Sequence, residues 1–336
     1  MNFARGITLT FKVNTIQAKI LKELIADGRK NVNEIAKKIG VSRETVKRNY
    51  QKLEEAAIIK GATIHINYKL FGYQAVAHIL ITADPKQADQ LIEYLKGMPE
   101  VYAFYERGIR GKIDVIAILK TLGHLNEIKD DIKRRFSVLE MKTVIWTDVK
   151  EMNQNLAIIN ENRKNLKEPE TNQIETGKKI KLASGKIDEI DQKISDKLAK
   201  DGRISMQLLS KELGISTTAA KRKYERLKGI GALKVTIQID ASKIGYQALC
   251  VFFIVTSGEK VPLTIEKISR IPDIISIMKT TGDYDLQVYA MVQNLNQLLF
   301  IQEEIGKIQG ITQIDAEILR LIMDKWPSPK QYISTF

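Results

Sequence analysis

Two segments of the sequence place basic and hydrogen-bonding side chains on one face of an expected helix. Each segment follows a serine, Ser42 or Ser216, that can cap the free amides at a helix N-terminus. After Ser42, the side chains of Val46, Tyr50 and Leu53 recur at helical spacing and form an inward apolar stripe. The remaining face carries Arg43, Glu44, Thr45, Lys47, Arg48 and Gln51. The corresponding face after Ser216 carries Thr217, Thr218, Lys221, Arg222, Lys223 and Arg226.

These residue types suit contacts with double-stranded DNA. A recognition helix presents its N-terminal side chains to base edges in the major groove, while Lys and Arg fix its register on phosphates. Arg43 is the best candidate for a bidentate contact with guanine. A short helix and a glycine precede each serine, which is typical of a helix-turn-helix unit. A solvated lysine-rich surface is the alternative interpretation of either face, but the same turn and the same basic face occur twice.

A second group of polar residues surrounds a glycine late in the chain. Its members are Thr280, Thr281, Gly282, Asp283 and Asp285. Gly282 lets the backbone turn closely, and the carboxylates can accept hydrogen bonds from the amino group of a small ligand or from backbone amides. Matching Gly111 with Gly282 places Lys112 at the position of Asp283, where a lysine would repel an ammonium ligand. We therefore predict ligand binding at the later turn; plain turn chemistry and paired catalytic carboxylates are the alternatives.

The sequence offers few residues for metal binding or catalysis. The three histidines, His65, His78 and His124, lie far apart in the sequence, and the single cysteine, Cys250, lies in an apolar run. One cysteine argues against disulfides and Cys-based zinc sites, and suits a reducing cytosol. The sequence contains no glycine-rich phosphate loop, Gly-x-Ser-x-Gly turn or Ser/His/Asp set. These features predict a protein that is not an enzyme and that needs no metal or cofactor.

The chain contains two copies of one sequence pattern. The stretch ending ETVKRNYQKL at Leu53 matches the stretch ending TAAKRKYERL at Leu227, position by position and without a gap. The offset between the copies shortens by a single position at Gly72-Tyr73, which matches Gly245-Tyr246. So small a drift predicts one fold in two copies, with changes confined to loops.

Hydrophobic periodicity gives the elements of each copy. Three short helices come first, and an alternating strand follows at Ala62–Asn67. The first copy then reads strand, helix, strand, strand, helix, strand over Ala75–Thr82, Pro85–Leu95, Val101–Glu106, Ile113–Leu119, His124–Phe136 and Lys142–Val149. The second copy reads likewise over Leu249–Val255, Leu263–Ile268, Ile274–Lys279, Leu286–Val292, Leu295–Ile308 and Ile314–Met323. The βαββαβ order is the ferredoxin-like motif, so the fold class is α+β: a tandem repeat of a winged-helix-like helix-turn-helix unit and a ferredoxin-like module.

The expected domains follow from this order of elements. They are a first helix-turn-helix domain (1–61), a first ferredoxin-like module (62–150), a linker (151–186), a second helix-turn-helix domain (187–235), a second ferredoxin-like module (236–326) and a C-terminal tail (327–336). The linker is polar and without sustained periodicity. A packed extension that docks on the first copy is the alternative for that segment.

Charge is concentrated where a nucleic acid would bind. The 336 residues carry 53 Lys and Arg against 40 Asp and Glu, a net charge of +13. Residues 14–60 have a net charge of +5 and residues 188–234 of +4. The longest apolar run, Ala248–Val255, is too short to cross a bilayer, and the first residues lack the apolar core of a secretory signal. We expect a cytoplasmic protein with a polyanionic partner and no membrane.

Together these residues resemble the leucine-responsive regulator/AsnC (Lrp/AsnC, feast/famine) family of transcriptional regulators. The resemblance rests on Asp27-Gly28-Arg29, Asp201-Gly202-Arg203, Ile39-Gly40-Val41-Ser42, Leu213-Gly214-Ile215-Ser216, Gly72-Tyr73, Gly245-Tyr246 and Thr281-Gly282-Asp283-Tyr284-Asp285. It covers nearly the whole chain except the linker and the termini, as two family members fused head to tail. It implies DNA binding modulated by a small-molecule effector such as an amino acid, bound through Thr280, Thr281, Gly282, Asp283 and Asp285. It also implies pairing through the ferredoxin-like sheets, as an intramolecular pseudo-dimer or a homo-oligomer.

The sequence departs from the family pattern at two equivalent positions, and two alternative functions remain open. The family usually has arginine seven residues after the cap serine, where this chain has Asn49 and Lys223. Sirohaem decarboxylases share the fold but carry a His-Asn-Tyr-x-Arg-like segment, whereas here Arg107 and Arg110 occur without the histidine and asparagine. The remaining alternative is an interaction or scaffold protein whose helix-turn-helix units no longer bind DNA.

Overall fold

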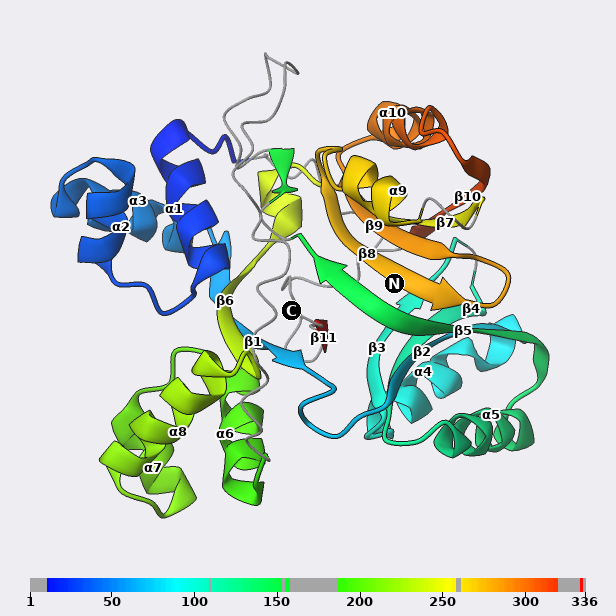
Figure 1. The fold of residues 1–336 in the computed structure, drawn as a ribbon, viewed down its shortest axis with the longest axis horizontal. Coiled ribbons are helices and arrows are strands. Elements are labelled where there is room, and N and C mark those ends of the chain that lie inside the picture. The colour runs from blue at the N-terminus through cyan, green and yellow to red at the C-terminus, as the bar shows by residue number, and fades with distance from the viewer. Residues whose placement is uncertain are drawn as a thin grey trace.

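A computed structural model describes residues 11–108, 110–152, 155–157, 187–257, 261–319 and 333–334. The first copy contains α1 (Thr15–Ala26), α2 (Val32–Ile39), α3 (Arg43–Glu55), β1 (Ile59–Asn67), β2 (Ala75–Ala83), the 3₁₀ turn η1 (Pro85–Gln87), α4 (Ala88–Gly97), β3 (Val101–Glu106), β4 (Lys112–Leu119), α5 (Gly123–Arg135) and β5 (Val138–Glu151). The second contains α6 (Glu189–Lys200), α7 (Met206–Leu213), α8 (Thr217–Gly229), β6 (Leu233–Ile239), η4 (Ala241–Ile244), β7 (Ala248–Thr256), α9 (Val261–Ile268), β8 (Ile274–Thr281), β9 (Leu286–Val292), α10 (Leu295–Gly306), β10 (Ile311–Leu319) and β11 (Ile333–Ser334). The α-helices and the first five strands of each copy follow one another in the same order, while the 3₁₀ turns differ and β11 has no counterpart in the first copy (Figure 1).

Local sequence explains where the first helices begin and end. At the start of α1, the Asn14 side chain accepts from the Gln17 amide at 2.9 Å, and the Gln17 side chain accepts from the Asn14 amide at 3.0 Å. Asn31 and Glu34 form the same reciprocal capping box at the start of α2. Helix α2 ends at Gly40, whose φ of +73° lies in the left-handed region that glycine adopts without strain.

Strands β1 and β6 form an antiparallel ribbon that joins the two three-helix units (Figure 1). Thr63 pairs with Thr236 at its centre, and both side chains are fully buried. The Thr63 hydroxyl donates to the Ala199 carbonyl at 2.8 Å, and the Thr236 hydroxyl donates to the Ile25 carbonyl at 3.0 Å. Helix α1 therefore packs on β6 and helix α6 on β1, so each three-helix unit completes its core with a strand from the other copy.

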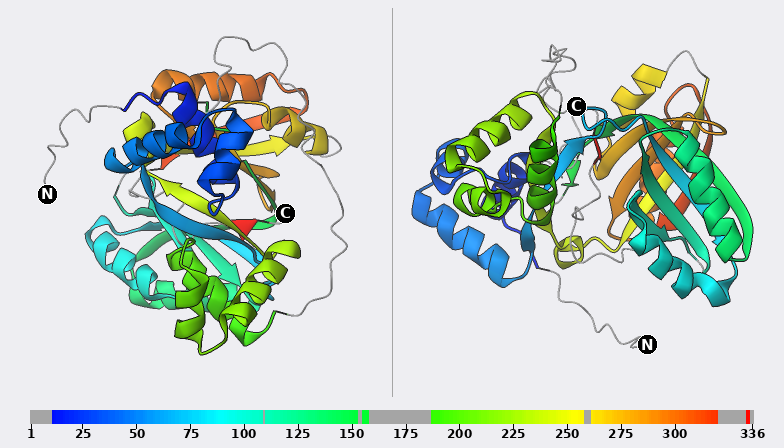
Figure 2. Two further views of the ribbon diagram at one scale, coloured as in Figure 1. Left: turned by 90° about the vertical axis from the view of Figure 1, so that its left-hand side faces the viewer. Right: turned by 90° about the horizontal axis from the view of Figure 1, so that it is seen from below.

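The remaining long strands form one antiparallel sheet in the order β10-β7-β9-β8-β5-β2-β4-β3. Each copy contributes four adjacent strands, with its last, first, third and second strand side by side. That is the ferredoxin-like arrangement, and it confirms the expected α+β fold class. Helices α4 and α5 cover the outer face of one half, and helices α9 and α10 cover that of the other (Figures 1 and 2).

The sheet curves until its two edges meet. The halves join along β5 and β8, where Trp146 pairs with Thr280. At the opposite edges, Leu319 of β10 forms an antiparallel bridge with Arg107, which directly follows β3. The offset that relates Gly72 to Gly245 also relates Trp146 to Leu319 and Arg107 to Thr280, so the two seams are equivalent positions of the repeat. The ferredoxin-like modules thus associate within one chain.

A buried polar cluster lies on the inner face of this sheet. The Asp114 carboxylate is 2.5 Å from Nε of Arg107 and 3.1 Å from Nε2 of His78. Arg107 also donates at 2.8 Å to both carboxylate oxygens of Glu317, on the opposite edge strand. Gln287 Oε1 lies 3.2 Å from Nδ1 of His78. The cluster ties β2 and β4 of the first copy to β9 and β10 of the second.

The expected order of helices and strands is confirmed, with ends that differ by a few residues. Strand β1 runs from Ile59 to Asn67, so it crosses the predicted boundary after residue 61; the limits of the six segments stay a prediction. Residues 155–157 pack on the second copy, because the Asn155 amide donates to the carbonyls of Ile271 and Ile274 at 2.7 and 3.0 Å. Most of the predicted linker and tail lies outside the described residues. Within the described ranges, no helix is long and apolar enough to cross a membrane.

Candidate nucleic-acid interface and effector turn

The first recognition helix, α3, is held by the stripe that the sequence predicts. Ser42 caps it, accepting from the Thr45 amide at 3.1 Å. Val46 and Leu53 are fully buried. Five of the six predicted DNA contacts on this helix have exposed side chains: Arg43, Glu44, Lys47, Arg48 and Gln51. Thr45 is half-buried, and its hydroxyl lies 2.9 Å from that of Ser42. The basic face predicted for α3 is therefore open to solvent.

The second recognition helix, α8, divides its predicted contacts into two groups. The side chains of Thr217, Thr218, Lys221 and Arg222 are exposed. Lys223 instead approaches Asp188 at 2.5 Å and Asp191 at 3.1 Å, and Arg226 forms an ion pair with Asp191. The hydrogen bond from Lys223 lowers the pKa of Asp188 to about 2. Lys223 and Arg226 thus fasten α8 to the N-terminus of α6.

The corresponding contact in the first copy uses amides in place of ions. Asn49 occupies the position of Lys223, and its side chain is buried. It donates to the Thr45 carbonyl at 2.9 Å and accepts from the Asn14 side chain at 3.4 Å. The position where the family usually has arginine therefore faces the N-terminus of α1 in this chain. A missing positive charge at Asn49 removes nothing from the exposed face of α3.

The two units have a defined mutual geometry. Both lie on the same side of the molecule, one on either side of the β1–β6 ribbon (Figure 2). The tripeptides Asp27-Gly28-Arg29 and Asp201-Gly202-Arg203 contact each other's copies at this ribbon. This structural role was not predicted from the sequence, although the repetition of the tripeptide at equivalent positions could have indicated one.

The predicted effector residues lie at the end of β8 and in the turn that leads to β9. The Thr280 amide donates to the Asp285 carbonyl at 2.9 Å, and the Thr280 hydroxyl donates to the Tyr284 carbonyl at 2.5 Å. The Asp285 carboxylate accepts from the amide and hydroxyl of Thr256 at 2.7 and 3.2 Å. Asp285 therefore holds two strands together. Thr281, Gly282 and Asp283 are exposed at the tip of the turn, and Gly282 has a φ of +120°.

Strand register corrects one expectation about this turn. Ile113 pairs with Glu106, and the equivalent pair in the second copy is Leu286 with Lys279. Arg110 is therefore the equivalent of Asp283, and the expected equivalence of Lys112 with Asp283 is wrong. A glycine match misled the comparison because Gly111 and Gly282 occupy different positions of turns of equal length. The position still carries a cation in the first copy, since Arg110 forms an ion pair with Asp89.

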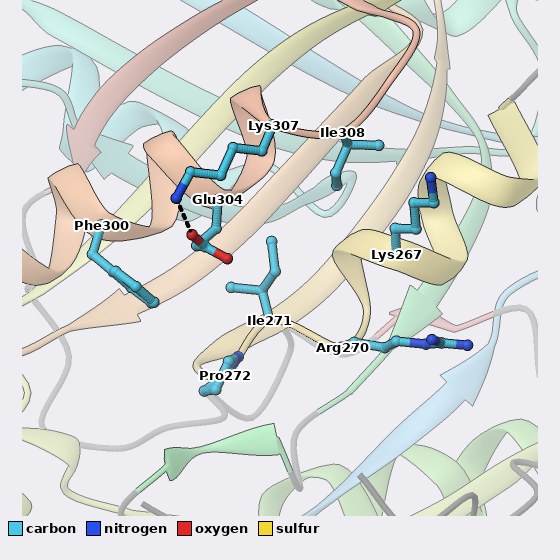
Figure 3. Close-up of a pocket in the computed structure, with 8 residues that line it drawn as sticks. All are labelled: Lys267, Arg270, Ile271, Pro272, Phe300, Glu304, Lys307 and Ile308. Carbon is cyan, nitrogen blue, oxygen red and sulfur yellow. Dashed lines mark hydrogen bonds and ion pairs between the residues drawn. The ribbon is translucent and has the colours of Figure 1, made fainter. Parts of the chain in front are cut away.

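A shallow groove of about 400 Å³ lies elsewhere on the second module, between α9 and α10 (Figure 3). It is lined by Lys267, Arg270, Ile271, Pro272, Phe300, Glu304, Lys307 and Ile308. Lys307 pairs with Glu304 at 2.7 Å within the groove, and Arg270 pairs with Glu266 at 2.5 Å on its rim. The predicted effector residues do not line this groove.

Histidine and cysteine positions are consistent with packing. His78 is fully buried, with ring centroids of Trp146 and Phe253 each 6.2 Å away. Burial raises the pKa of the Cys250 thiol to about 12, so this side chain stays protonated in the core. Among the residues that the structure describes, no group of three or more His, Cys, Asp or Glu side chains could hold a metal ion.

Comparison with known proteins identifies both kinds of domain. Residues 13–60 match a winged helix-turn-helix DNA-binding family, residues 187–228 an AsnC-type helix-turn-helix domain, and residues 249–319 the Lrp/AsnC ligand binding domain. The HTH-type transcriptional regulator LrpA of Pyrococcus horikoshii is 30% identical over 135 residues, which cover 40% of this chain and 96% of that protein. The chain belongs to the Lrp/AsnC family of transcriptional regulators.

A second regulator and a solved structure are also similar to this chain. The HTH-type transcriptional regulator FL11 of Pyrococcus furiosus is 30% identical over 128 residues, covering 38% of this chain and 85% of that protein. These relatives match less than half of this Lrp/AsnC chain because it contains the pattern twice. A solved structure of the siroheme decarboxylase NirDL covers 96% of this chain and 94% of its own, with a TM-score of 0.59 and 13% identity. That likeness covers nearly the whole chain, and at this identity it concerns the fold alone.

Proposed function

We propose that this Lrp/AsnC chain is a sequence-specific transcriptional regulator that binds double-stranded DNA as an intramolecular pseudo-dimer, with α3 and α8 as its two recognition helices. The observation that carries the proposal is the β1–β6 ribbon, which joins two helix-turn-helix units on one side of a single chain. A two-fold protein reads two half-sites about one helical turn apart, and this chain supplies both readers itself. The proposed DNA contacts are the exposed members of the two predicted sets: Arg43, Glu44, Lys47, Arg48, Gln51, Thr217, Thr218, Lys221 and Arg222.

Genome-wide mapping of bound DNA in the native host tests this proposal and supplies the binding site. Titration of the recovered site against salt then tests the electrostatics. About four phosphate contacts predict an affinity loss of roughly 100-fold between 50 and 200 mM salt. A chain that recovers no enriched sequence and shows no salt-dependent binding is the scaffold protein of the alternative interpretation.

We further propose that the turn between β8 and β9 binds a small effector, with Asp283 as the acceptor for an amino group. Asp283 is exposed next to Gly282 at the tip of the turn, whereas the Asp285 carboxylate is occupied by Thr256. A thermal-shift screen of amino acids on the wild type and on Asp283→Ala tests this role. The expected result is one ligand per chain, with binding abolished in the folded variant. Binding that survives Asp283→Ala assigns the effector to another surface.

The proposal includes that the protein acts without catalysis and works in the cytoplasm. An enzyme of the sirohaem decarboxylase type would have to bind a tetrapyrrole. In the described part of the interior of the closed sheet, Trp146, Phe253 and Tyr289 pack around the buried polar cluster. Adding iron tetrapyrrole to the purified chain is therefore expected to give no haem-type absorption shift and no turnover. Either signal would overturn this part of the proposal.

A further inference from the structure

The two Asp-Gly-Arg turns approach each other's strands so closely that only glycine fits. The Gly28 amide donates to the Val235 carbonyl at 2.9 Å, and the Gly202 amide donates to the Ala62 carbonyl at 2.8 Å. A Cβ on Gly28 would lie 2.8 Å from the carbonyl carbon of Thr236. Real Cβ atoms avoid such distances, so each turn is seated directly on the backbone of the other copy.

Each turn also sends an arginine across to the other copy. Arg29 donates from Nε to the Gly202 carbonyl at 2.8 Å and from its terminal nitrogen to the Ile204 carbonyl at 2.5 Å. Its guanidinium lies 5.1 Å above the ring of Tyr224, within the range of a cation–π contact. Tyr224 belongs to α8, so Arg29 of the first copy is stacked on the recognition helix of the second.

The reciprocal contact repeats this arrangement. Arg203 donates from Nε to the Gly28 carbonyl at 2.7 Å and from Nη1 to the Tyr50 hydroxyl. Its guanidinium lies 5.5 Å from the centre of the Tyr50 ring. Tyr50 belongs to α3, so each recognition helix is held by an arginine from the opposite unit.

We propose that Arg29 and Arg203 form a reciprocal clamp that sets the separation and orientation of α3 and α8, and thereby the half-site spacing that the protein accepts. The guanidinium is suited to this role because its planar fork reaches two carbonyl or hydroxyl acceptors while its face stacks on a ring. Lysine at the same position keeps the charge but loses the fork and the stacking plane. The part of this inference that concerns DNA rests on the function proposed above, whereas the part that concerns helix geometry does not.

The first experiment needs no DNA. Spin labels at Arg48→Cys and Arg222→Cys, two exposed positions on α3 and α8, report the distance between the helices by pulsed dipolar spectroscopy. The buried Cys250, whose thiol pKa is raised by burial, stays unlabelled. The labelled chain should give a narrow distance distribution, and the R29K/R203K variant a distribution at least about twice as wide. Equal widths in the two proteins would overturn the clamp whether or not the chain binds DNA.

The second experiment uses the unlabelled chain on duplexes that carry the two half-sites at varied separation. Shifting the separation by about five base pairs, half a helical turn, should weaken wild-type binding about tenfold or more. In R29K/R203K that discrimination should fall below about threefold, while affinity for a single half-site stays within about twofold. Arg134→Lys, an exposed exchange of the same kind on α5, should behave as the wild type.

The outcomes separate the two proposals. A broadened distribution in a chain that binds no DNA overturns the proposed function and keeps the clamp as a structural feature. A variant that keeps full spacing discrimination, or that loses affinity equally for every separation and for a single half-site, overturns the role in spacing. If R29K/R203K does not fold, Tyr50→Leu removes the ring and hydroxyl that Arg203 contacts, and the same broadening is expected there.

Discussion

Substitution of Asp114 tests how the buried polar side chains inside the closed sheet pair with one another. Trp146 Nε1 lies 2.6 Å from Gln287 Oε1, and an indole N–H can only donate, so this contact fixes the orientation of the Gln287 amide. His78 Nδ1 faces the same oxygen at 3.2 Å and must therefore carry a proton. Its Nε2 faces Asp114 at 3.1 Å, and Arg107 Nε faces the other oxygen of that carboxylate. One further proton has to lie between His78 and Asp114 for this contact to be attractive.

Two substitutions of Asp114 should then lower the free energy of unfolding by very different amounts. Asp114→Leu leaves the Arg107 guanidinium and the His78 ring without their acceptor, and breaking a buried ion pair in this way costs about 3–5 kcal/mol. The contact of Arg107 Nη1 with both oxygens of Glu317 persists, so the lower end, about 3 kcal/mol, is expected. Asp114→Asn keeps an oxygen acceptor for Arg107 and places an amide N–H opposite the unprotonated Nε2 of a neutral His78. All partners stay paired, so the loss should be about 1 kcal/mol or less.

Urea unfolding at pH 7, followed by far-UV circular dichroism, measures both losses from the midpoints and a shared slope. Glu140→Gln, at an exposed position on β5 that pairs with the exposed Lys142, is the control and should change the free energy of unfolding little. Equal destabilisation by Asp114→Asn and Asp114→Leu would refute this reasoning, because it would mean that the cluster requires the negative charge of Asp114 and that polar partners of matching shape are not enough.

Three further predictions concern the helix-turn-helix units. Arg43→Ala should cost about 1–3 kcal/mol on the preferred site and relax specificity, whereas Lys221→Ala should weaken binding to all sequences nearly evenly, as measured by fluorescence anisotropy on specific and random duplexes. Lys223 lowers the pKa of Asp188 to about 2, below its ordinary value, so this pairing stabilises the fold above about pH 4 and is lost as the pH falls through 2. Asp188→Asn keeps the cap but should lower the urea midpoint clearly at pH 7 and much less at pH 2, where about half of the Asp188 side chains are already protonated. Gly202→Ala places a Cβ 2.9 Å from the backbone of β1 and should destabilise by about 1–3 kcal/mol in urea unfolding.

Each of these predictions has an opposing outcome. Equal effects of the Arg43 and Lys221 variants on specific and random DNA would remove Arg43 from base recognition. An Asp188→Asn loss that is as large at pH 2 as at pH 7 would show that the charge of Asp188 is not its source. Gly229→Ala, whose added Cβ would meet open space, is the control for Gly202→Ala and should be close to neutral. A Gly202→Ala variant as stable as this control would contradict the close approach of the two copies.

Periodicity and capping residues were enough to predict the local structure of this chain. Ser42 and Gly40 bound the turn before α3 because their chemistry acts within a few residues. The apolar runs of β2 and β4 likewise identify the ferredoxin-like modules, since each strand is buried and faces a helix on its outer side. The sequence does not reveal which copy supplies the strand beneath a given helix, because the Thr63 and Thr236 contacts join residues far apart in the chain.

The candidate DNA surface was predicted less completely, for a related reason. Helical spacing identifies the side chains that point away from the core of one unit, but not the partners offered by another helix. Spacing alone predicts DNA contacts for Lys223 and Arg226, whereas their partners, Asp188 and Asp191, lie at the start of a different helix, α6. The effector turn shows the same limit, since the register that aligns Arg110 with Asp283 depends on strand pairing.

The two copies differ in a coupled way that explains one departure from the family pattern. Where the second copy has the ions Asp188, Asp191 and Lys223, the first has the amides Asn14, Gln17 and Asn49 at equivalent positions. Lysine at position 49 would face two neutral amides, and asparagine at position 223 would remove one of the two cations that the structure places on the buried carboxylate of Asp191. The three residues of each set therefore suit one another, and a residue of one set would not suit the other set. The residue seven positions after the cap serine contributes to the contact between a recognition helix and the first helix of its unit. Asparagine at this position in the first copy therefore preserves the packing of the unit, and it does not indicate that the first recognition helix has lost DNA binding.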